Sequence, residues 1–427
     1  MLDIQYIREH ADLVKAGVEK KKVDPKLVDK FLRADEMWKA KVAAIDELRR
    51  EQNVISKELA GGQKDDLVSK ATLLKTRIGQ LEKEVADLAA KRTGFLNRLP
   101  NVPAPDVPVG PDESANRVLR EVGERPVFDF PVKDYLSIGE RLGLIDVKRA
   151  AKVSGSRFGY LLREGALLEF ALERLALDTL LPHGFVPVIP PVMVRPEMLE
   201  GMGRLAADQK EERYFLEKDG LYLVGSAEHS MGPFHAGETL DENRLPKRYV
   251  GFSTSFRREA GSYGKDTKGI LRVHQFDKVE LFSFCHPEKS EEEHRFLLSL
   301  QEELVAALEL PYRVVEMCTG DMGWTDFRQF DVDIWFPAEG CYRETHSCSN
   351  TTDFQSRGIN AKFTAGGEKG YLHLLNATAF SQRPILAILE NYQTKRGTVR
   401  VPKALQKYVG KKEIVGENQK SDLKNQS

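Results

Sequence analysis

The residues best suited to chemistry lie between 250 and 282, where two apolar, strand-like stretches carry charges. Side chains alternate between the two faces of a strand. One face of the first stretch therefore holds four polar residues: Ser253, Ser255, Arg257 and Glu259. One face of the second stretch holds Arg272, His274, Phe276 and Glu280. If the two stretches pair as a hairpin, we expect one continuous polar surface.

The length of this surface limits what it binds. Arg272 lies about 13 Å from Phe276 along an extended strand, and Phe276 lies equally far from Glu280. An amino acid is too short for that distance, whereas a nucleotide joined to an amino acid fits it. The alternative is an exposed, charged sheet face. The opposite face is apolar, and charges in a cavity are costly unless a charged ligand meets them, which favours a binding site.

Three other segments carry polar groups at short spacing: Ser226 with Glu228, Glu344 with Ser347, and Asn376 with Thr378 and Arg383. Glu344 and Ser347 could share Mg²⁺ with phosphate oxygens, since Mg²⁺ prefers oxygen ligands. Arg383 stands where a helix is expected to begin, a position that suits an anion. Taken singly, each group is more often structural. Asn376 also matches a glycosylation acceptor, but we find no secretory signal.

Cysteine usage gives no sign of a zinc site. The four cysteines are Cys285, Cys318, Cys341 and Cys348, and none forms a C-x-x-C pair. Cys341 and Cys348 could join His346 as metal ligands, but buried thiols are the ordinary interpretation. Few cysteines fit a reducing compartment, and we see neither a transit peptide nor a long apolar run. We therefore predict a cytoplasmic protein without a membrane partner.

The bulk composition describes a globular protein of two or three domains, with 427 residues, 41% hydrophobic and 30% charged. Its net charge of −1 provides no general attraction for nucleic acid. Any contact with nucleic acid must come from a local patch.

The elements that must position these groups begin with an unusual helical segment, 27–99. Its second half has apolar residues at alternating steps of four and three: Leu67, Ala71, Leu74, Ile78, Leu81, Val85 and Leu88. Its first half has a looser seam of the same period: Phe31, Trp38, Val42, Ile45, Ile55 and Leu59. Gly61 and Gly62 break the helix between them. The pattern predicts an antiparallel hairpin of two helices, each of about 33 residues and roughly 50 Å long.

This hairpin buries only one seam, so it is either a spacer, a dimerisation coiled coil or an arm that contacts something distant. Basic residues gather near its tip: Lys64, Lys70, Lys75 and Arg77. On periodicity alone, a solvated face is the favoured explanation of these residues. A proline-rich linker, 99–114, follows, and we place the domain boundary at 105/106. The second domain runs over 106–410, and 411–427 is expected to be a polar C-terminal tail.

The order of strand-like and helical segments in the second domain predicts an antiparallel sheet flanked by helices, which is an α+β fold. Strands are expected at 221–224, 248–258, 270–284, 312–318, 329–336 and 371–375, and helices at 162–182, 289–308 and 383–393. The segment "FVPVIPPVMV" contains Pro187, Pro190 and Pro191, so it belongs at a sheet edge or an interface.

These segments together resemble bacterial-type seryl-tRNA synthetases, which are class II aminoacyl-tRNA synthetases, along nearly the whole chain. The matching stretches are "FRREAGSYGKDTKGILRVHQFDKVE" (motif 2), "SAE" at 226–228, with Ser for the usual Thr, "CSNTTDFQSR" and "LNAT…ILENYQ" (motif 3). The proline-bearing segment matches the dimer-forming motif 1, and the helical hairpin matches the tRNA-binding arm. In motif 3, Arg383 comes one residue earlier than is usual in the family.

The resemblance implies roles for individual residues. The implied catalytic residues are Arg257, Arg272, Glu280 and Arg383. ATP would be bound by Arg257, Arg258, Glu259, Arg272, Val273, Phe276, Glu344, Thr345, His346, Ser347 and Arg383. Serine would be bound by Ser226, Ala227, Glu228, Arg257, Glu280, Asn376 and Thr378. Mg²⁺ would be held by Glu344 and Ser347.

The resemblance also implies the reaction and the partners. Serine is activated with ATP to seryl-adenylate and then transferred to the 3′ end of tRNA(Ser), with tRNA(Sec) as a further candidate. A homodimer through the segment around Pro190 and Pro191 is implied, and residues 260–269 would reach the tRNA end. Two alternatives stay open at this point: an enzyme that charges a carrier protein, and a catalytically silent paralogue that acts as an RNA-binding or structural protein.

Overall fold

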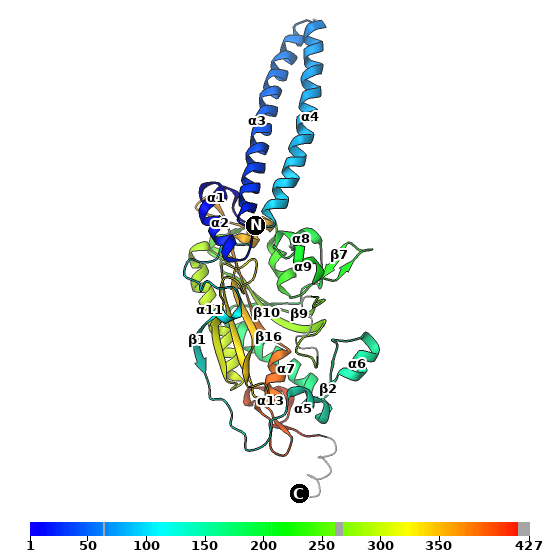
Figure 1. Cartoon of the computed structure of the whole chain (residues 1–427), viewed down its shortest axis with the longest axis vertical. Coiled ribbons are helices and arrows are strands. Elements are labelled where there is room, and N and C mark those ends of the chain that lie inside the picture. Colours follow the sequence, from blue (N-terminus) through cyan, green and yellow to red (C-terminus); the bar gives the residue numbers. More distant parts are fainter. Residues whose placement is uncertain (63–64, 206, 261–267, 417–427) are drawn as a thin grey trace. The chain divides into compact units, whose positions relative to one another are not determined.

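The protein is described here from a computed structural model, which covers residues 1–62, 65–205, 207–260 and 268–416 (Figure 1). The chain divides into two compact units, Met1–Val102 and Pro103–Ser427. Three sequence predictions fall at least partly outside the described residues: Lys64 in the basic cluster, most of the long turn 260–269, and the end of the tail. None of the described helices is long and apolar enough to cross a membrane.

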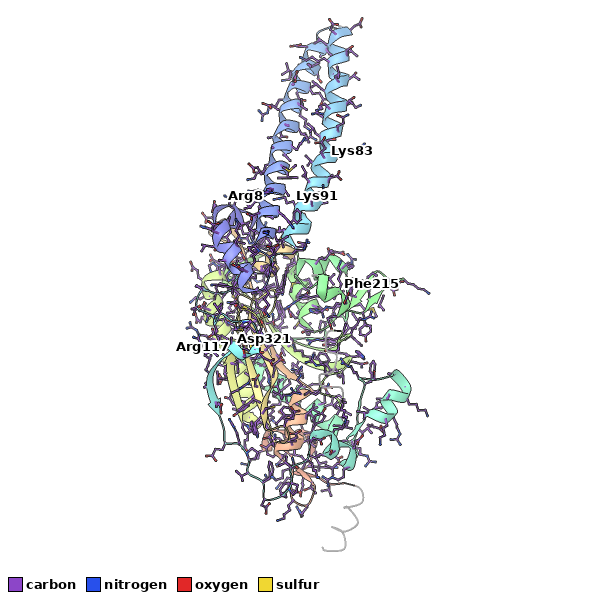
Figure 2. All side chains as sticks on the ribbon, viewed as in Figure 1. Arg8, Lys83, Lys91, Arg117, Phe215 and Asp321 are labelled. Carbon is purple, nitrogen blue, oxygen red and sulfur yellow. The ribbon has the colours of Figure 1, made fainter. Side chains whose placement is uncertain are left out.

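The first unit is entirely helical, as its heptad pattern predicts. Its helices are α1 (Ile4–Glu9), α2 (Ala11–Lys20), α3 (Lys26–Ala60) and α4 (Asp65–Leu96). Helices α3 and α4 pack side by side as the predicted antiparallel hairpin (Figure 1). Ile45, Ile78 and Leu81 form the buried part of their seam, while Lys83 and Lys91 are exposed on α4 (Figure 2).

One buried carboxylate ties the base of this hairpin together. Asp35 is 2% exposed and accepts from Nε of Arg8 at 2.7 Å, while Nε of Arg92 lies 2.7 Å from its other oxygen. Burial by itself raises the pKa of Asp35, but the hydrogen bond and charge of Arg8, with the charges of Arg92 and Lys39, hold it below its ordinary value. The base of the hairpin is therefore an ion-paired cluster that joins α1, α3 and α4.

The second unit is built on one large sheet. Its eight strands are, in spatial order, β1 (Arg117–Val122), β11 (Tyr312–Glu316), β12 (Arg328–Phe336), β13 (Cys341–Asn350), β16 (His373–Ser381), β10 (Gln275–Cys285), β9 (Lys247–Phe256) and β4 (Val186–Val188). All neighbours are antiparallel except β4, which pairs parallel with β9. The proline-bearing segment therefore forms an edge strand, which confirms the sequence prediction.

Smaller sheets surround this large one. They contain β5 (Met193–Val194), β6 (Phe215–Leu216) and β7 (Leu221–Leu223); β8 (Thr239–Asp241), β14 (Lys362–Ala365) and β15 (Glu368–Tyr371); β2 (Ile145–Asp146) and β3 (Tyr160–Leu161); β17 (Val399–Arg400) and β18 (Glu413–Ile414). Strand β18 lies within the predicted tail, so the chain is still ordered at the start of that segment.

The described helices of the second unit are α5 (Tyr135–Leu142), α6 (Val147–Ser154), α7 (Glu164–Leu180), α8 (Pro196–Gly201), α9 (Ala207–Glu211), α10 (Glu228–Met231), α11 (Ser290–Ala307), α12 (Phe354–Ile359), α13 (Arg383–Asn391) and α14 (Lys403–Val409). Helices α7, α11 and α13 contact strands of the large sheet. Their apolar residues join those of the sheet in one large core. The predicted α+β fold is confirmed.

Several details differ from the sequence predictions. Strand β13, which has an alternating polar pattern, was not predicted, and neither was the fully exposed edge strand β1. Strand β10 begins at Gln275 rather than at 270. The first part of the proline-rich linker is not free, because Ala104 and Val107 are buried in a cluster of the second unit and the N–H of Ala104 donates to the carbonyl of Phe327.

Candidate active site

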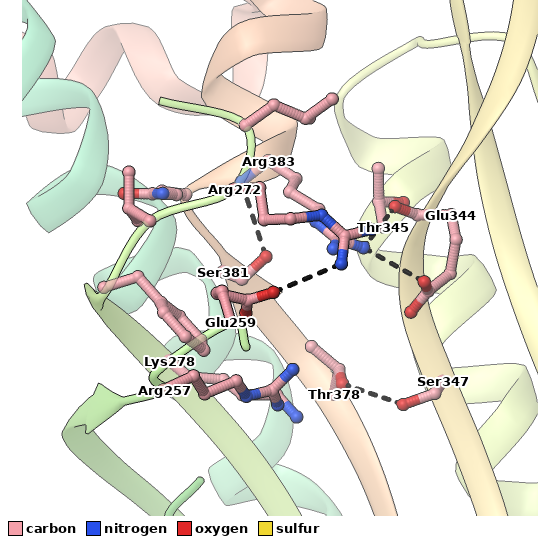
Figure 3. Close-up of a pocket in the computed structure, with 14 residues that line it drawn as sticks. Arg257, Glu259, Arg272, Lys278, Glu344, Thr345, Ser347, Thr378, Ser381 and Arg383 are labelled. Atoms are coloured by element: carbon pink, nitrogen blue, oxygen red, sulfur yellow. Dashed lines mark hydrogen bonds and ion pairs between the residues drawn. The ribbon is translucent and has the colours of Figure 1, made fainter. Parts of the chain in front are cut away.

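A cavity of about 210 Å³ opens over the middle strands of the large sheet. Its lining comes from β10, β13, β16, the start of α13 and the segments that flank residues 261–267 (Figure 3). Ten of the predicted site residues line it: Arg257, Glu259, Arg272, Val273, Phe276, Glu344, Thr345, Ser347, Thr378 and Arg383. The cavity thus gathers residues that are far apart in the sequence.

Strand alternation explains one wall of the cavity. In the pairing of β9 with β10, Ser255 lies opposite Phe276 and Ser253 lies opposite Lys278. Lys278 has the same parity as Phe276 and Glu280, and it lines the cavity although we did not predict it as a site residue. The alternation that selected its two neighbours also identifies Lys278. Its ammonium lies 2.5 Å from Oε2 of Glu280.

Two β-bulges build the opposite wall. Residues three apart on a regular strand point to opposite faces, yet Glu344 and Ser347 both line the cavity. Thr345 is an extra residue in the pairing of β13 with β12, because His346 pairs with Val332 and Glu344 with Asp333. A bulge of this kind shifts the alternation by one residue. It therefore turns Glu344 to the face on which Ser347 lies.

The second bulge lies on β16, the neighbouring strand. Ala379 is the extra residue, because Phe380 pairs with Val279 and Thr378 with Glu280. Thr378 and Ser381 are again three residues apart, and both line the cavity. Two adjacent strands thus use the same device, which sequence alternation alone does not reveal.

Arg257 occupies the centre of the polar surface. Its Nε donates to the carbonyl of Gly225 at 3.1 Å, and its guanidinium lies over the ring of Phe276 at 5.1 Å. Burial lowers the pKa of Arg257, and the nearby charge of Arg383 lowers it further, while Glu259 opposes both. The planar guanidinium therefore has its remaining N–H groups available for a planar or tetrahedral anion.

Two ion pairs cross the cavity mouth (Figure 3). Arg272 donates to Oε2 of Glu259 at 3.2 Å, and Glu259 has a φ of 53°, in the left-handed region. Arg383 donates to the backbone carbonyl of Glu344 at 2.8 Å and lies 3.1 Å from its Oε2. Burial raises the pKa of Glu344, but the charge and hydrogen bond of Arg383, with Arg257 and Lys278, hold it below its ordinary value. Glu344 is therefore a carboxylate at neutral pH.

The predicted serine-binding residues form a second, deeper group. Ser226 donates to Oε2 of Glu280 at 3.3 Å, and both residues are at most 4% exposed. Glu228 accepts from Arg204 at 2.6 Å and from Gln355 at 3.0 Å, in both cases through Oε1. Burial raises the pKa of Glu280, although Lys278 opposes this. The site thus contains two buried carboxylates with different partners.

The remaining residues of this group are also buried. Ala227 is fully buried, and Thr378 lies opposite Glu280 in the pairing of β16 with β10. Asn376 is 4% exposed, and within the described part of the chain its Nδ2 has no hydrogen-bond partner. Such an orphan donor is costly unless a ligand or water satisfies it. Arg204 and Gln355, which hold Glu228, were not predicted from the sequence.

Three side chains singled out by the sequence lie away from the cavity. Arg258 lies over the ring of Tyr214 at 5.7 Å. Nδ1 of His274 donates to the carbonyl of Arg257 at 2.9 Å, because strand alternation does not extend to the irregular residues before β10. His346 is fully buried and its ring contacts Phe380. Its neighbours Thr345 and Ser347 line the cavity, whereas the side chain of His346 does not. Burial lowers the pKa of His346 to about 3.

The comparisons with known proteins cover the whole chain. Residues 1–103 match the family described as "Seryl-tRNA synthetase N-terminal domain", and residues 214–392 match "tRNA synthetase class II core domain (G, H, P, S and T)". A serine–tRNA ligase of Acidothermus cellulolyticus is 46% identical over 416 residues, which are 96% of this chain and 98% of that protein. The chain belongs to the seryl-tRNA synthetase family.

Solved structures of seryl-tRNA synthetases show the same fold. The enzyme of Pyrococcus horikoshii, complexed with ATP, is 44% identical with a TM-score of 0.92, over 97% of this chain and 100% of that one. The cytoplasmic serine–tRNA ligase of Naegleria fowleri, in complex with AMP, is 33% identical with a TM-score of 0.87, over 98% and 99%. A Giardia lamblia prolyl-tRNA synthetase, at 17% identity and a TM-score of 0.56, shares the fold alone.

Members of the seryl-tRNA synthetase family are expected to use Mg²⁺, and we tested whether the residues present suit it. Glu344 and Ser347 offer two hard oxygen ligands on the same side of the cavity, which fits an ion that keeps water and phosphate oxygens as further ligands. No cluster of three or more His, Cys, Asp or Glu side chains that could hold a metal occurs in the described part of the chain. The donor chemistry therefore fits a cation held jointly with a phosphate ligand, not a closed protein cage.

Proposed function

We propose that this protein activates L-serine with ATP and transfers the seryl group to tRNA(Ser). One observation carries the proposal: in a chain that matches serine–tRNA ligases over nearly its full length, Arg257, Arg272 and Arg383 converge with Glu344 and Ser347 on one cavity. The related enzyme of Pyrococcus horikoshii was crystallised with ATP. ATP binding is accordingly assigned to this cavity.

In the first step, a carboxylate oxygen of serine attacks the α-phosphorus of ATP. A new P–O bond forms, the bond to the bridging oxygen of pyrophosphate breaks, and pyrophosphate leaves with the electron pair. The attacking carboxylate is already ionised, so no general base is needed. Arg257 and Arg272 stabilise the charge that grows on the phosphorus oxygens, and Arg383 holds the far phosphate once ATP displaces it from Glu344.

The remaining nucleotide contacts follow from the lining of the cavity. The adenine ring stacks on Phe276, whose other contact is the guanidinium of Arg257. Val273 and Glu259 line the same cavity and would contact the nucleotide, and Glu344, Thr345 and Ser347 would lie near its phosphates. Arg258 and His346 contribute through their backbone groups, because their side chains point elsewhere. Glu344 and Ser347 would hold Mg²⁺, which would neutralise charge on the phosphates.

Serine is held by the buried group below the nucleotide. Glu228 and Glu280 receive the ammonium and the hydroxyl, with Ser226, Asn376 and Thr378 as hydrogen-bonding neighbours and Ala227 restricting the space. A site built to pair a hydroxyl rejects alanine, because its polar groups would be left unpaired. The shape of the site must exclude the extra methyl group of threonine. In the second step, a terminal ribose hydroxyl of tRNA attacks the adenylate carbonyl, and AMP leaves.

We propose that residues 1–105, which include the whole first unit, are the tRNA-binding domain, with the helical arm at 27–99. The exposed lysines of the arm suit phosphate contacts, which position a nucleic acid without reading its bases. The catalytic domain is 106–410. Charging of tRNA(Sec) is a further candidate activity, which the same assay with that tRNA decides. The cytoplasmic location stays a prediction from the sequence.

A homodimer through the segment around Pro190 and Pro191 is supported by exposed apolar side chains. Phe170 is 63% exposed, Val186 53% and Ile189 89%, on α7 and the edge strand β4 and beside it. Large apolar side chains that are exposed in this way can mark interaction surfaces. We expect sedimentation to give a dimer, and Ile189→Asp with Phe170→Asp to give a monomer. A dimer unchanged by both substitutions would contradict this interface.

The decisive experiment is serine-dependent exchange of pyrophosphate into ATP, without tRNA. We expect exchange with serine and not with alanine, and a loss of about 10³-fold in Arg257→Ala. Thermal melting of the variant shows whether it is folded. No exchange by the folded wild-type protein would support a catalytically silent paralogue instead. Transfer to a carrier protein in preference to tRNA would support the other alternative, which the full-length similarity to serine–tRNA ligases does not favour.

A further inference from the structure

Arg213 is a positively charged residue of the serine-binding region to which neither the sequence motifs nor the proposed mechanism gives a role. It stands shortly before β6, where the chain passes the Ser226–Glu228 segment. Its Nε is buried, and among the described residues it has no hydrogen-bond partner. The half-buried side chain also makes no ion pair within the described part of the chain, although an enclosed charge normally has one.

The position of Arg213 is defined by Gly225. A Cβ atom built on Gly225 would lie 2.1 Å from Nη1 of Arg213, so only glycine lets the guanidinium approach this backbone. The carbonyl of the same glycine accepts from Nε of Arg257 at 3.1 Å. Two guanidinium groups thus contact one residue, which directly precedes Ser226. The contact places Arg213 next to the serine-binding group as well as next to Arg257.

The charges around Arg213 leave it without a counter-ion. Burial, together with the charges of Arg257 and Arg204, lowers the pKa of Arg213 to about 10, although Glu228 and Glu212 oppose this shift. The closest carboxylate of the serine group, Glu228, already accepts from Arg204 and Gln355. His229 cannot provide negative charge, and burial together with these arginines keeps its pKa well below 6.5. The region therefore carries an excess of positive charge that an anionic ligand would balance.

We infer that Arg213 binds the carboxylate of L-serine together with Arg257. The inference rests on the proposed function and adds a residue to its substrate site. Serine brings one carboxylate, and two guanidinium groups from different directions would fix the orientation of the oxygen that attacks ATP. A phosphate of ATP is the other possible anion. Arg213 is absent from the lining of the cavity that holds Glu344 and Arg383, which favours the carboxylate.

The test compares L-serine with serinol, which keeps the ammonium and the hydroxyl but replaces the carboxylate by a second hydroxymethyl group. In pyrophosphate exchange, Arg213→Met is expected to raise the KM for serine at least about 10-fold, because a charged hydrogen bond is lost. The inhibition constant of serinol and the KM for ATP should stay within about threefold of wild type. Arg213→Lys should fall between wild type and Arg213→Met.

A matched control is Lys210→Met, which removes an exposed charge three residues away and should change neither constant. Equal weakening of serine and serinol would show general damage and overturn the inference. A rise confined to the KM for ATP would assign Arg213 to a phosphate, and unchanged constants would leave it without a role in binding. If Arg213→Met does not fold, Arg213→Lys decides between the same outcomes. Failure of exchange in the wild-type protein would instead refute the proposed function.

Discussion

Beyond the Asp35 cluster, charged side chains of α3 and α4 pair in water, as Lys41 does with Glu84 at 2.6 Å. At the site of the second unit, charged side chains are enclosed, and Lys278 and Glu280 are at most 9% exposed. Exposed ion pairs contribute little, because water solvates each charge nearly as well. Enclosed charges are costly unless they meet partners. The helical arm is therefore complete without a ligand, whereas the cavity is organised around one.

The same contrast appears in two buried carboxylates. Asp35 at the base of the arm is paired with arginines, which hold its pKa below the ordinary value. Glu390 on α13 is fully buried and accepts from the backbone N–H groups of Tyr135 and Ala338, at 3.0 Å each. Burial raises the pKa of Glu390 to about 7, although those two hydrogen bonds oppose the shift. The two units should consequently respond to pH in opposite directions.

The largest effect is expected from removing the bulge at Thr345. Deletion of this residue restores regular alternation, turns Glu344 away from Ser347 and should lower pyrophosphate exchange by at least about 10²-fold. Thr345→Ala keeps the extra residue and should retain most activity. Deletion of Leu119, the extra residue in the pairing of the edge strand β1 with β11, is the matched control. Equal activity after both deletions would show that the bulge does not set the site.

Shortening the arm should affect only the second step. Residues 42–83 can be replaced by a short glycine-rich turn, because Lys41 and Glu84 lie side by side and the Asp35 cluster remains intact. Exchange should stay within about twofold, while charging of tRNA(Ser) should fall by about 10²-fold or more as phosphate contacts are lost. Filter-bound seryl-tRNA measures the charging. Undiminished charging would refute the role of the arm.

A smaller effect is expected for the pH dependence of the second unit. Because the folded-state pKa of Glu390 is raised, its contribution is fully present below the unfolded-state value and is lost as pH rises through about 7. The loss amounts to about 3 kcal/mol at most. Glu390→Gln should flatten the fall in thermal stability from about pH 5 to about pH 9. Glu124→Gln, at an exposed position, should leave the slope unchanged.

The smallest effect is the reverse one at the base of the arm. The folded-state pKa of Asp35 is lowered, so its contribution is present above the unfolded-state value and is lost as pH falls through the folded-state value. Asp35→Asn should weaken the helical unit at neutral pH and remove part of its sensitivity to acid. Hydrogen exchange of the α3 and α4 amides measures this locally. A helical unit with unchanged acid sensitivity would contradict the assignment.

The sequence alone determined what depends on local repetition and on residue type. The heptad seam predicts the helical hairpin, because a period of 3.5 residues has one structural solution. Pro187, Pro190 and Pro191 predict an edge strand, since proline cannot donate in a central ladder. Alternation predicts that Ser253, Ser255 and Phe276 share a surface, and the pairing of β9 with β10 confirms it.

Only the tertiary structure decided how the site is assembled. The bulges at Thr345 and Ala379 reverse alternation on two strands, and a bulge is defined by the partner strand rather than by its own residues. Lys278 follows the alternation, but only the structure shows that it forms an ion pair with Glu280. The position of Arg213 is set by its close approach to Gly225, and no sequence spacing predicts that contact. These positions are set by contacts between segments that are distant in the sequence. Such contacts leave no periodic pattern from which they could be predicted.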